Sequence, residues 1–91
     1  MTSLVGPGGT AAVVCVRLGP GGRIGRHPAA ASQLFAVVQG EGWVSGADGE
    51  QVPVAAGEAA LWEPGEEHEA GTDVGMTAVV VEADQLEPPP A

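Results

Sequence analysis

The sequence contains no lysine, no tyrosine and only one cysteine, Cys15, among its 91 residues. A single cysteine excludes a disulfide within the chain, and its place in the apolar run AAVVCVRL predicts a packed, reduced thiol, which is typical of a cytoplasmic protein. A domain of this size is only marginally stable unless something besides its core supports it. Because disulfides are excluded, a metal ion and self-association are the supports that remain.

Positive charge is also scarce, since three arginines stand against twelve acidic residues and give a formal net charge of -9. This balance repels phosphate backbones and anionic lipid surfaces, so we expect neither nucleic acid nor a membrane as a partner. No apolar run approaches the roughly 18 residues that cross a bilayer, and the amino terminus lacks the basic and then apolar pattern of a secretory signal. Both absences favour a cytoplasmic location.

Long uninterrupted segments are missing too, because fifteen glycines and eight prolines divide the chain into pieces too short for most helices. Valine-rich runs recur between these breaks, which predicts an all-β fold. The Asp-Gly pair within GADGE favours a tight hairpin between the strands on either side. The predicted strands cover residues 11–18, 23–27, 33–39, 42–45, 51–54, 58–63, 67–70 and 76–82.

Many short strands with turns at this spacing indicate a sandwich or a closed barrel. We expect one domain over residues 1–83. The segment 84–91 ends in three consecutive prolines, which cannot donate hydrogen bonds to a sheet, so it is predicted to be an extended or disordered tail.

The only two histidines fall within two glycine-bounded patterns. The first pattern contains Gly21, His27, Ala29, Gln33 and Gly40, and the second contains Gly57, Gly65, His68 and Thr72. Their spacing resembles the two motifs of the cupins, which are small β-barrels. The resemblance implies a cupin-like barrel, also known as a jelly roll or double-stranded β-helix, that is built from two antiparallel sheets.

A full cupin site offers three histidines and one glutamate to a divalent metal. Here the resemblance implies His27, Gln33 and His68 as metal ligands, because Ala29 stands at the place of the middle histidine and Gln33 at that of the glutamate. Three neutral ligands leave positions open around an ion that keeps its full charge, which suits an anionic, chelating substrate. Zinc, iron, manganese, nickel and copper all accept such a set.

The pocket walls follow from strand geometry, because alternate residues of a strand face the same side. Phe35 and Val37 share the face of Gln33 and, together with Trp62, are predicted to line the pocket. No residue is assigned as catalytic, and no general base is evident.

Structural alternatives stay open for each of these residues. His27 could be an ordinary polar residue at a strand end, His68 a solvated loop histidine among Glu66, Glu67 and Glu69, and Gln33 a hydrogen-bonding residue alone. Two functions therefore compete. The first is a small-molecule-binding metalloprotein, which is either an enzyme of the dioxygenase, isomerase, lyase or cyclase type or a protein without catalysis. The second is a metal-free ligand-binding or sensor protein.

The opposite face of strand 33–39 carries Leu34, Ala36 and Val38, which a closed barrel leaves toward solvent. An exposed apolar stripe usually contacts a partner. We therefore expect a homodimer, which is also common among small cupins.

Overall fold

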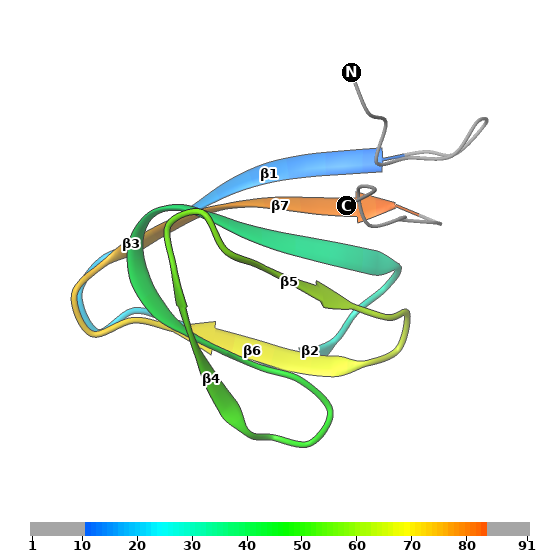
Figure 1. The fold of residues 1–91 in the computed structure, drawn as a ribbon. Coiled ribbons are helices and arrows are strands. Elements are labelled where there is room, and N and C mark those ends of the chain that lie inside the picture. The colour runs from blue at the N-terminus through cyan, green and yellow to red at the C-terminus, as the bar shows by residue number, and fades with distance from the viewer. Residues whose placement is uncertain (1–10, 84–91) are drawn as a thin grey trace.

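The computed structural model describes residues 11–83, and within that range the chain forms strands and turns but no helix, so no membrane-spanning helix occurs there (Figure 1). The predicted tail, 84–91, lies outside the described residues. The seven strands are β1 (Ala11–Leu18), β2 (Arg23–Pro28), β3 (Ser32–Ser45), β4 (Gln51–Ala55), β5 (Ala59–Trp62), β6 (Glu67–Gly71) and β7 (Met76–Ala83).

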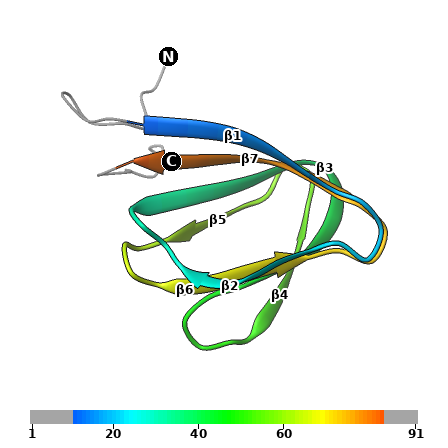
Figure 2. The same ribbon diagram turned by 180° about the vertical axis from the view of Figure 1, so that it is seen from behind.

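The strands form two antiparallel sheets that share β3. The first half of β3 pairs with β5 on one side and β7 on the other, and β1 pairs with β7. The second half of β3 pairs with β4 and β6, and β2 pairs with β6. Figures 1 and 2 show the two sheets facing each other as a rolled sandwich. The predicted all-β fold of two antiparallel sheets is confirmed.

The prediction of two separate strands, 33–39 and 42–45, is wrong, because β3 runs through both as one strand of 14 residues. Gly40 adopts a φ of 80°, and the ladder with β7 shifts register between Val37 and Gln39. Residues other than glycine rarely adopt this backbone conformation, and a Cβ at Gly40 would also overlap the carbonyl oxygen of Gly75. The glycines that resemble a turn in the sequence thus let one strand pass from the first sheet into the second.

The predicted hairpin is present between β3 and β4, with Ser45 opposite Gln51. Its loop covers residues 46–50 and closes through a hydrogen bond from the Gly49 amide to the Gly46 carbonyl, 3.0 Å long. Gly49 has a φ of 75°, whereas Asp48 has a negative φ. The loop is therefore longer than the two-residue turn that an Asp-Gly pair favours.

The core lies between the two sheets, where alternate residues of each strand point inward. Phe35 and Val37 are each 2% exposed and belong to one apolar cluster. The other buried members of that cluster are Val44, Val54, Trp62, Ala70, Met76, Ala78 and Val80.

The prediction that Cys15 is a packed thiol is wrong. The side chain is exposed on β1, an edge strand that pairs only with β7 among the described strands. Cys15 lies opposite Val79 on the outer face of the first sheet, so it does not contribute to the core.

Replacing Gly40 by alanine tests the role of this residue in β3. Gly40→Ala should lower the free energy of unfolding by about 1–2 kcal/mol for the left-handed backbone and by roughly 1–3 kcal/mol more for the steric overlap. Gly49→Ala is the matched control, because its φ is 75° but nothing lies within 4 Å of the added Cβ. Urea unfolding should show a larger loss of stability for Gly40→Ala. Equal losses would contradict the close packing of β3 at this point.

Candidate metal centre

His27 and His68 lie directly opposite each other on the neighbouring antiparallel strands β2 and β6. Their ring centroids are 4.3 Å apart and the ring planes are inclined at 57°. The β2–β6 ladder is irregular between Ile24 and His27, which sets the register that aligns the two histidines. Residues that are far apart in the sequence are thus brought together by one pair of strands.

The turn before β6 directs His68 toward the interior. The Glu66 amide donates to the Glu63 carbonyl over 3.0 Å, and Gly65 has a φ of 82° after Pro64. Proline followed by glycine is the usual centre of a type II turn. His68 is only 2% exposed, whereas His27 is exposed because β2 is the edge strand of its sheet. The alternative of a solvated loop histidine therefore does not describe His68.

Backbone carbonyl groups orient both imidazole rings. The Nδ1 atom of His27 donates to the Gly25 carbonyl over 2.7 Å, and the Nδ1 atom of His68 donates to the Glu66 carbonyl over 3.1 Å. Since a carbonyl oxygen can only accept, each Nδ1 carries the hydrogen, and the neutral ring keeps its lone pair on Nε2. Metal-binding histidines commonly have their second nitrogen held in this way.

Trp62 fixes the plane of the His68 ring. The two rings stack with centroids 4.3 Å apart and planes inclined at 23°. Phe35 contacts Trp62 in turn, with ring centroids 5.8 Å apart, so the histidine is supported by the aromatic part of the core.

Gln33 faces the interior and is 7% exposed. It lies opposite Trp62 in the β3–β5 ladder. Among the described residues, the Oε1 atom of Gln33 and the Nε2 atom of His68 are the buried side-chain polar atoms that lack a hydrogen-bond partner. An unsatisfied buried polar group costs about 1–3 kcal/mol. Both atoms are acceptors, so a cation or a donor group would satisfy them.

These donors fit a divalent metal, because imidazole nitrogen and amide oxygen are both ordinary ligands of such ions. Within residues 11–83 no three His, Cys, Asp or Glu side chains gather closely enough to hold an ion. A metal ion at the two imidazoles would therefore need a further donor that is not His, Cys, Asp or Glu, such as an amide oxygen. Ala29, 4% exposed, contributes only a methyl group.

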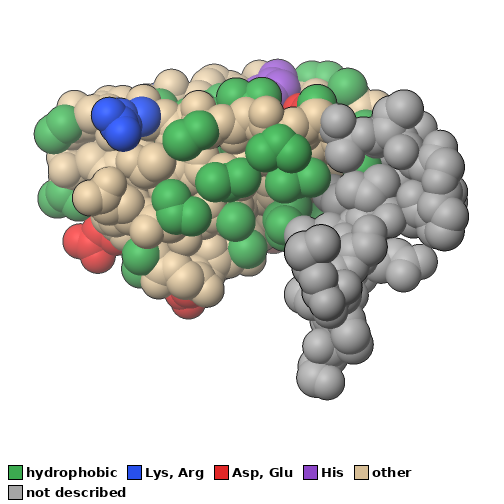
Figure 3. All heavy atoms as spheres, turned by 90° about the horizontal axis from the view of Figure 1, so that it is seen from above, with side chains coloured by type: hydrophobic (Ala, Val, Ile, Leu, Met, Phe, Trp, Pro, Cys, Tyr) green, Lys and Arg blue, Asp and Glu red, His purple; other side chains and the backbone are tan. Residues whose placement is uncertain are grey.

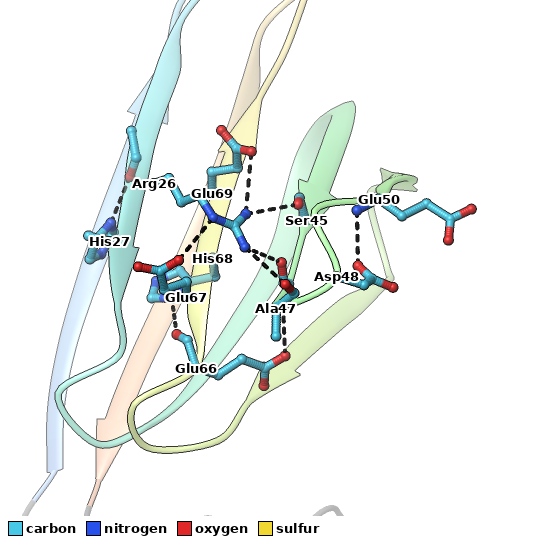
Figure 4. A network of polar contacts seen from close by, with 12 residues as sticks. Arg26, His27, Ser45, Ala47, Asp48, Glu50, Glu66, Glu67, His68 and Glu69 are labelled. Carbon is cyan, nitrogen blue, oxygen red and sulfur yellow. Dashed lines mark hydrogen bonds and ion pairs between the residues drawn. The ribbon is translucent and has the colours of Figure 1, made fainter.

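The glutamates that flank His68 are held by other groups. Strand alternation turns Glu67 and Glu69 to the face opposite His68, where Arg26 pairs with them at 3.3 and 3.6 Å (Figure 4). The Glu66 carboxylate accepts from the Glu63 amide at 3.0 Å. Arg26 also donates to the carbonyl of Gly46 over 2.8 Å, which ties the hairpin loop to β2.

The predicted wall residues have different surroundings. Phe35 and Val37 lie in the packed core, and Trp62 also borders a surface hollow of about 500 Å³ next to the 46–50 loop. His27, Gln33 and His68 do not line that hollow. Sequence reasoning missed the Gly25 and Glu66 carbonyls and the Arg26 contacts, because a backbone acceptor leaves no signal in residue type.

The family model for the cupin domain, Cupin_2, matches residues 14–83. The chain belongs to the cupin family. No curated protein matches it. Among solved structures, a predicted oxalate decarboxylase from Thermotoga maritima has a TM-score of 0.71 at 23% identity, covering 81% of this chain and 65% of its own.

Two further cupin structures are similar. An RmlC-like cupin from Shewanella frigidimarina has a TM-score of 0.76 at 24% identity, covering 81% of this chain and 66% of its own. An RmlC-like cupin family protein from Methanocaldococcus jannaschii with a double-stranded β-helix fold has a TM-score of 0.75 at 15% identity, covering 80% of this chain and 69% of its own. This cupin thus spans about two thirds of the length of these relatives, and the likeness establishes the fold.

Proposed function

We propose that this cupin is a small-molecule-binding metalloprotein in which His27, Gln33 and His68 hold a divalent metal ion. The observation that carries the proposal is the pair of buried acceptors without partners, Gln33 Oε1 and His68 Nε2. The close approach of the His27 ring to the His68 ring supports it, because a second imidazole then stands beside the buried histidine.

The residues present define the kind of ligand that such a centre would take. Because all three donors are neutral, the charge of the ion would remain available to an anionic, chelating small molecule. When bound, a divalent ion supplies Lewis-acid polarisation of a ligand oxygen. The likeness to a predicted oxalate decarboxylase agrees with a carboxylate as the ligand class.

A metal-free binding protein is the second candidate, and the same observation supports it. Gln33 Oε1 and His68 Nε2 could accept hydrogen bonds from N–H or O–H groups of an organic ligand. The two candidates differ in whether a metal ion alone binds next to Trp62.

Quenching of tryptophan fluorescence by cobalt(II) separates these candidates, because the chain has only two tryptophans. Trp43→Phe leaves Trp62, which stacks on His68. Trp62→Phe leaves Trp43, whose ring centroid lies 5.8 Å from the Arg23 guanidinium carbon. This variant keeps an aromatic ring at position 62. We expect saturable quenching in Trp43→Phe, much weaker quenching in Trp62→Phe, and none that saturates in Trp43→Phe/His68→Ala.

Two results together would favour the metal-free candidate. One is that Trp43→Phe shows no saturable quenching, and the other is that elemental analysis finds no metal in untagged protein grown with cobalt, zinc or iron. Equal quenching of Trp43 and Trp62 would show that cobalt binds elsewhere on this acidic chain.

We also propose that two copies associate through the outer face of the sheet β1-β7-β3-β5. Val13, Val81, Leu34 and Leu61 lie side by side in register across its four strands. Val13, Val38 and Leu61 are 66, 55 and 42% exposed. Figure 3 shows hydrophobic side chains gathered on this face. A contiguous apolar face of this kind is typical of an interaction surface.

Sedimentation of charge variants tests the association. Val38→Glu/Leu61→Glu places two like charges per copy in the proposed interface, which should convert a dimer into a monomer at micromolar concentration. Val74→Glu is the matched control, because Val74 is 62% exposed but lies in the turn before β7 rather than on this face. A wild-type chain that sediments as a monomer would contradict the proposal.

A further inference from the structure

Negative charge is missing from the candidate metal centre, although the chain as a whole is strongly acidic. The three glutamates nearest to His68 in sequence are held by other groups. Arg26 pairs with Glu67 and Glu69 on the other face of β6, and the Glu66 carboxylate accepts from the backbone amides of Glu63 and Ala47 at 3.0 and 3.3 Å.

Glu82 is the other carboxylate to consider, because it lies opposite Gln33 in the β3–β7 ladder. It does not join the two histidines in a group of ligating side chains, since no such group of three exists among residues 11–83. At the two remaining ligand positions of the cupin motif, Gln33 offers a neutral amide oxygen and Ala29 only a methyl group, and both residues are buried. Among residues 11–83, therefore, no Asp or Glu side chain joins the two histidines as a ligand, although Glu82 shares the sheet face of Gln33.

We infer that the centre binds its metal ion and a chelating dianion with positive coupling, so that the ligand supplies the negative charge that the protein lacks. This inference rests on the proposed metal site and adds how that site is loaded. The metal alone binds weakly because only neutral donors hold it. The anion alone binds weakly because the interior offers it unpaired acceptors and no cation. Each ligand raises the affinity for the other by the same factor, as linkage requires.

The coupling is measured with cobalt(II) and malonate, a soluble chelating dianion, by the quenching of Trp62 in Trp43→Phe. The protein is titrated with cobalt chloride alone, and then with cobalt premixed with one equivalent of malonate. We expect malonate to lower the apparent Kd for total cobalt by about 10-fold, within the range of measured couplings. Capture of cobalt by malonate in solution would raise this Kd, so a decrease reports a complex on the protein.

Small-molecule controls separate charge from shape. Acetate, a monodentate anion, should lower the Kd about two-fold or less, below the usual range of coupling. Malonamide, which has a similar shape without charge, should leave it unchanged.

A variant that moves the negative charge into the protein gives the sharpest comparison. Gln33→Glu should bind cobalt alone more tightly than the parent and should lose most of the malonate effect. Gln39→Glu is the matched control, because it adds the same charge at an exposed position of the same strand. Glu82→Gln tests the one neighbouring carboxylate and should change neither the Kd nor the malonate effect.

The outcomes are distinct. An apparent Kd that stays the same or rises with malonate overturns the coupling, while the proposed metal site stands if cobalt alone still quenches Trp62 in a manner that depends on His68. A Gln33→Glu protein that keeps the full malonate effect also overturns it. Absence of saturable quenching under every condition overturns the metal site itself. If Gln33→Glu does not fold, the malonate comparison on the parent protein decides alone.

Discussion

The contact between His27 and His68 across the β2–β6 ladder is the interaction on which the account of this cupin depends. It exists because two strands that are distant in sequence pair in one register, with an irregularity just before His27 and a tight turn just before β6. Carbonyl groups hold each ring at Nδ1, and Trp62 covers one face of His68. The geometry leaves Nε2 of His68 buried and unpaired, and a cation or a donor group would satisfy it.

The fold around this contact stabilises it from both sides. On the inner side, Phe35 and Trp62 connect the His68 ring to the apolar core. On the outer side, Arg26 links β2 to two glutamates of β6 and to the hairpin loop after β3. Because side chains alternate along β6, the acidic residues face outward while His68 and Ala70 face inward. The carboxylates of Glu67 and Glu69 therefore point away from the histidine pair and toward Arg26.

Much of this arrangement could be predicted from the sequence, since it depends on local patterns. Valine-rich runs between glycines and prolines predict the strands, and the spacing of the glycines and histidines indicates the cupin fold. Alternation along residues 33–39 correctly placed Gln33, Phe35 and Val37 on the inner face. Other features depend on tertiary context. The sequence around Gly40 predicts a turn, but Gly40 lies within a continuous strand. Its left-handed backbone and its close approach to Gly75 arise only when β3 pairs with β7.

Sheet face and edge position explain two further differences. Cys15 sits in an apolar run that looks buried, yet it is exposed because it lies on the outer face of the edge strand β1, whereas its neighbour Val16 packs against the core. His27 is exposed because β2 is the edge strand of the other sheet. The hydrogen bonds that orient the two imidazoles end on backbone carbonyls, and these acceptors cannot be predicted from residue type.

The central claim is that His27, Gln33 and His68 form one metal centre. Anomalous diffraction from crystals grown with cobalt(II) tests it most directly, using data collected on both sides of the cobalt absorption edge. The account predicts a cobalt peak within bonding distance of the Nε2 atoms of both histidines and the Oε1 atom of Gln33. A peak at surface carboxylates alone, or ordered density for these side chains without any cobalt between them, would contradict it.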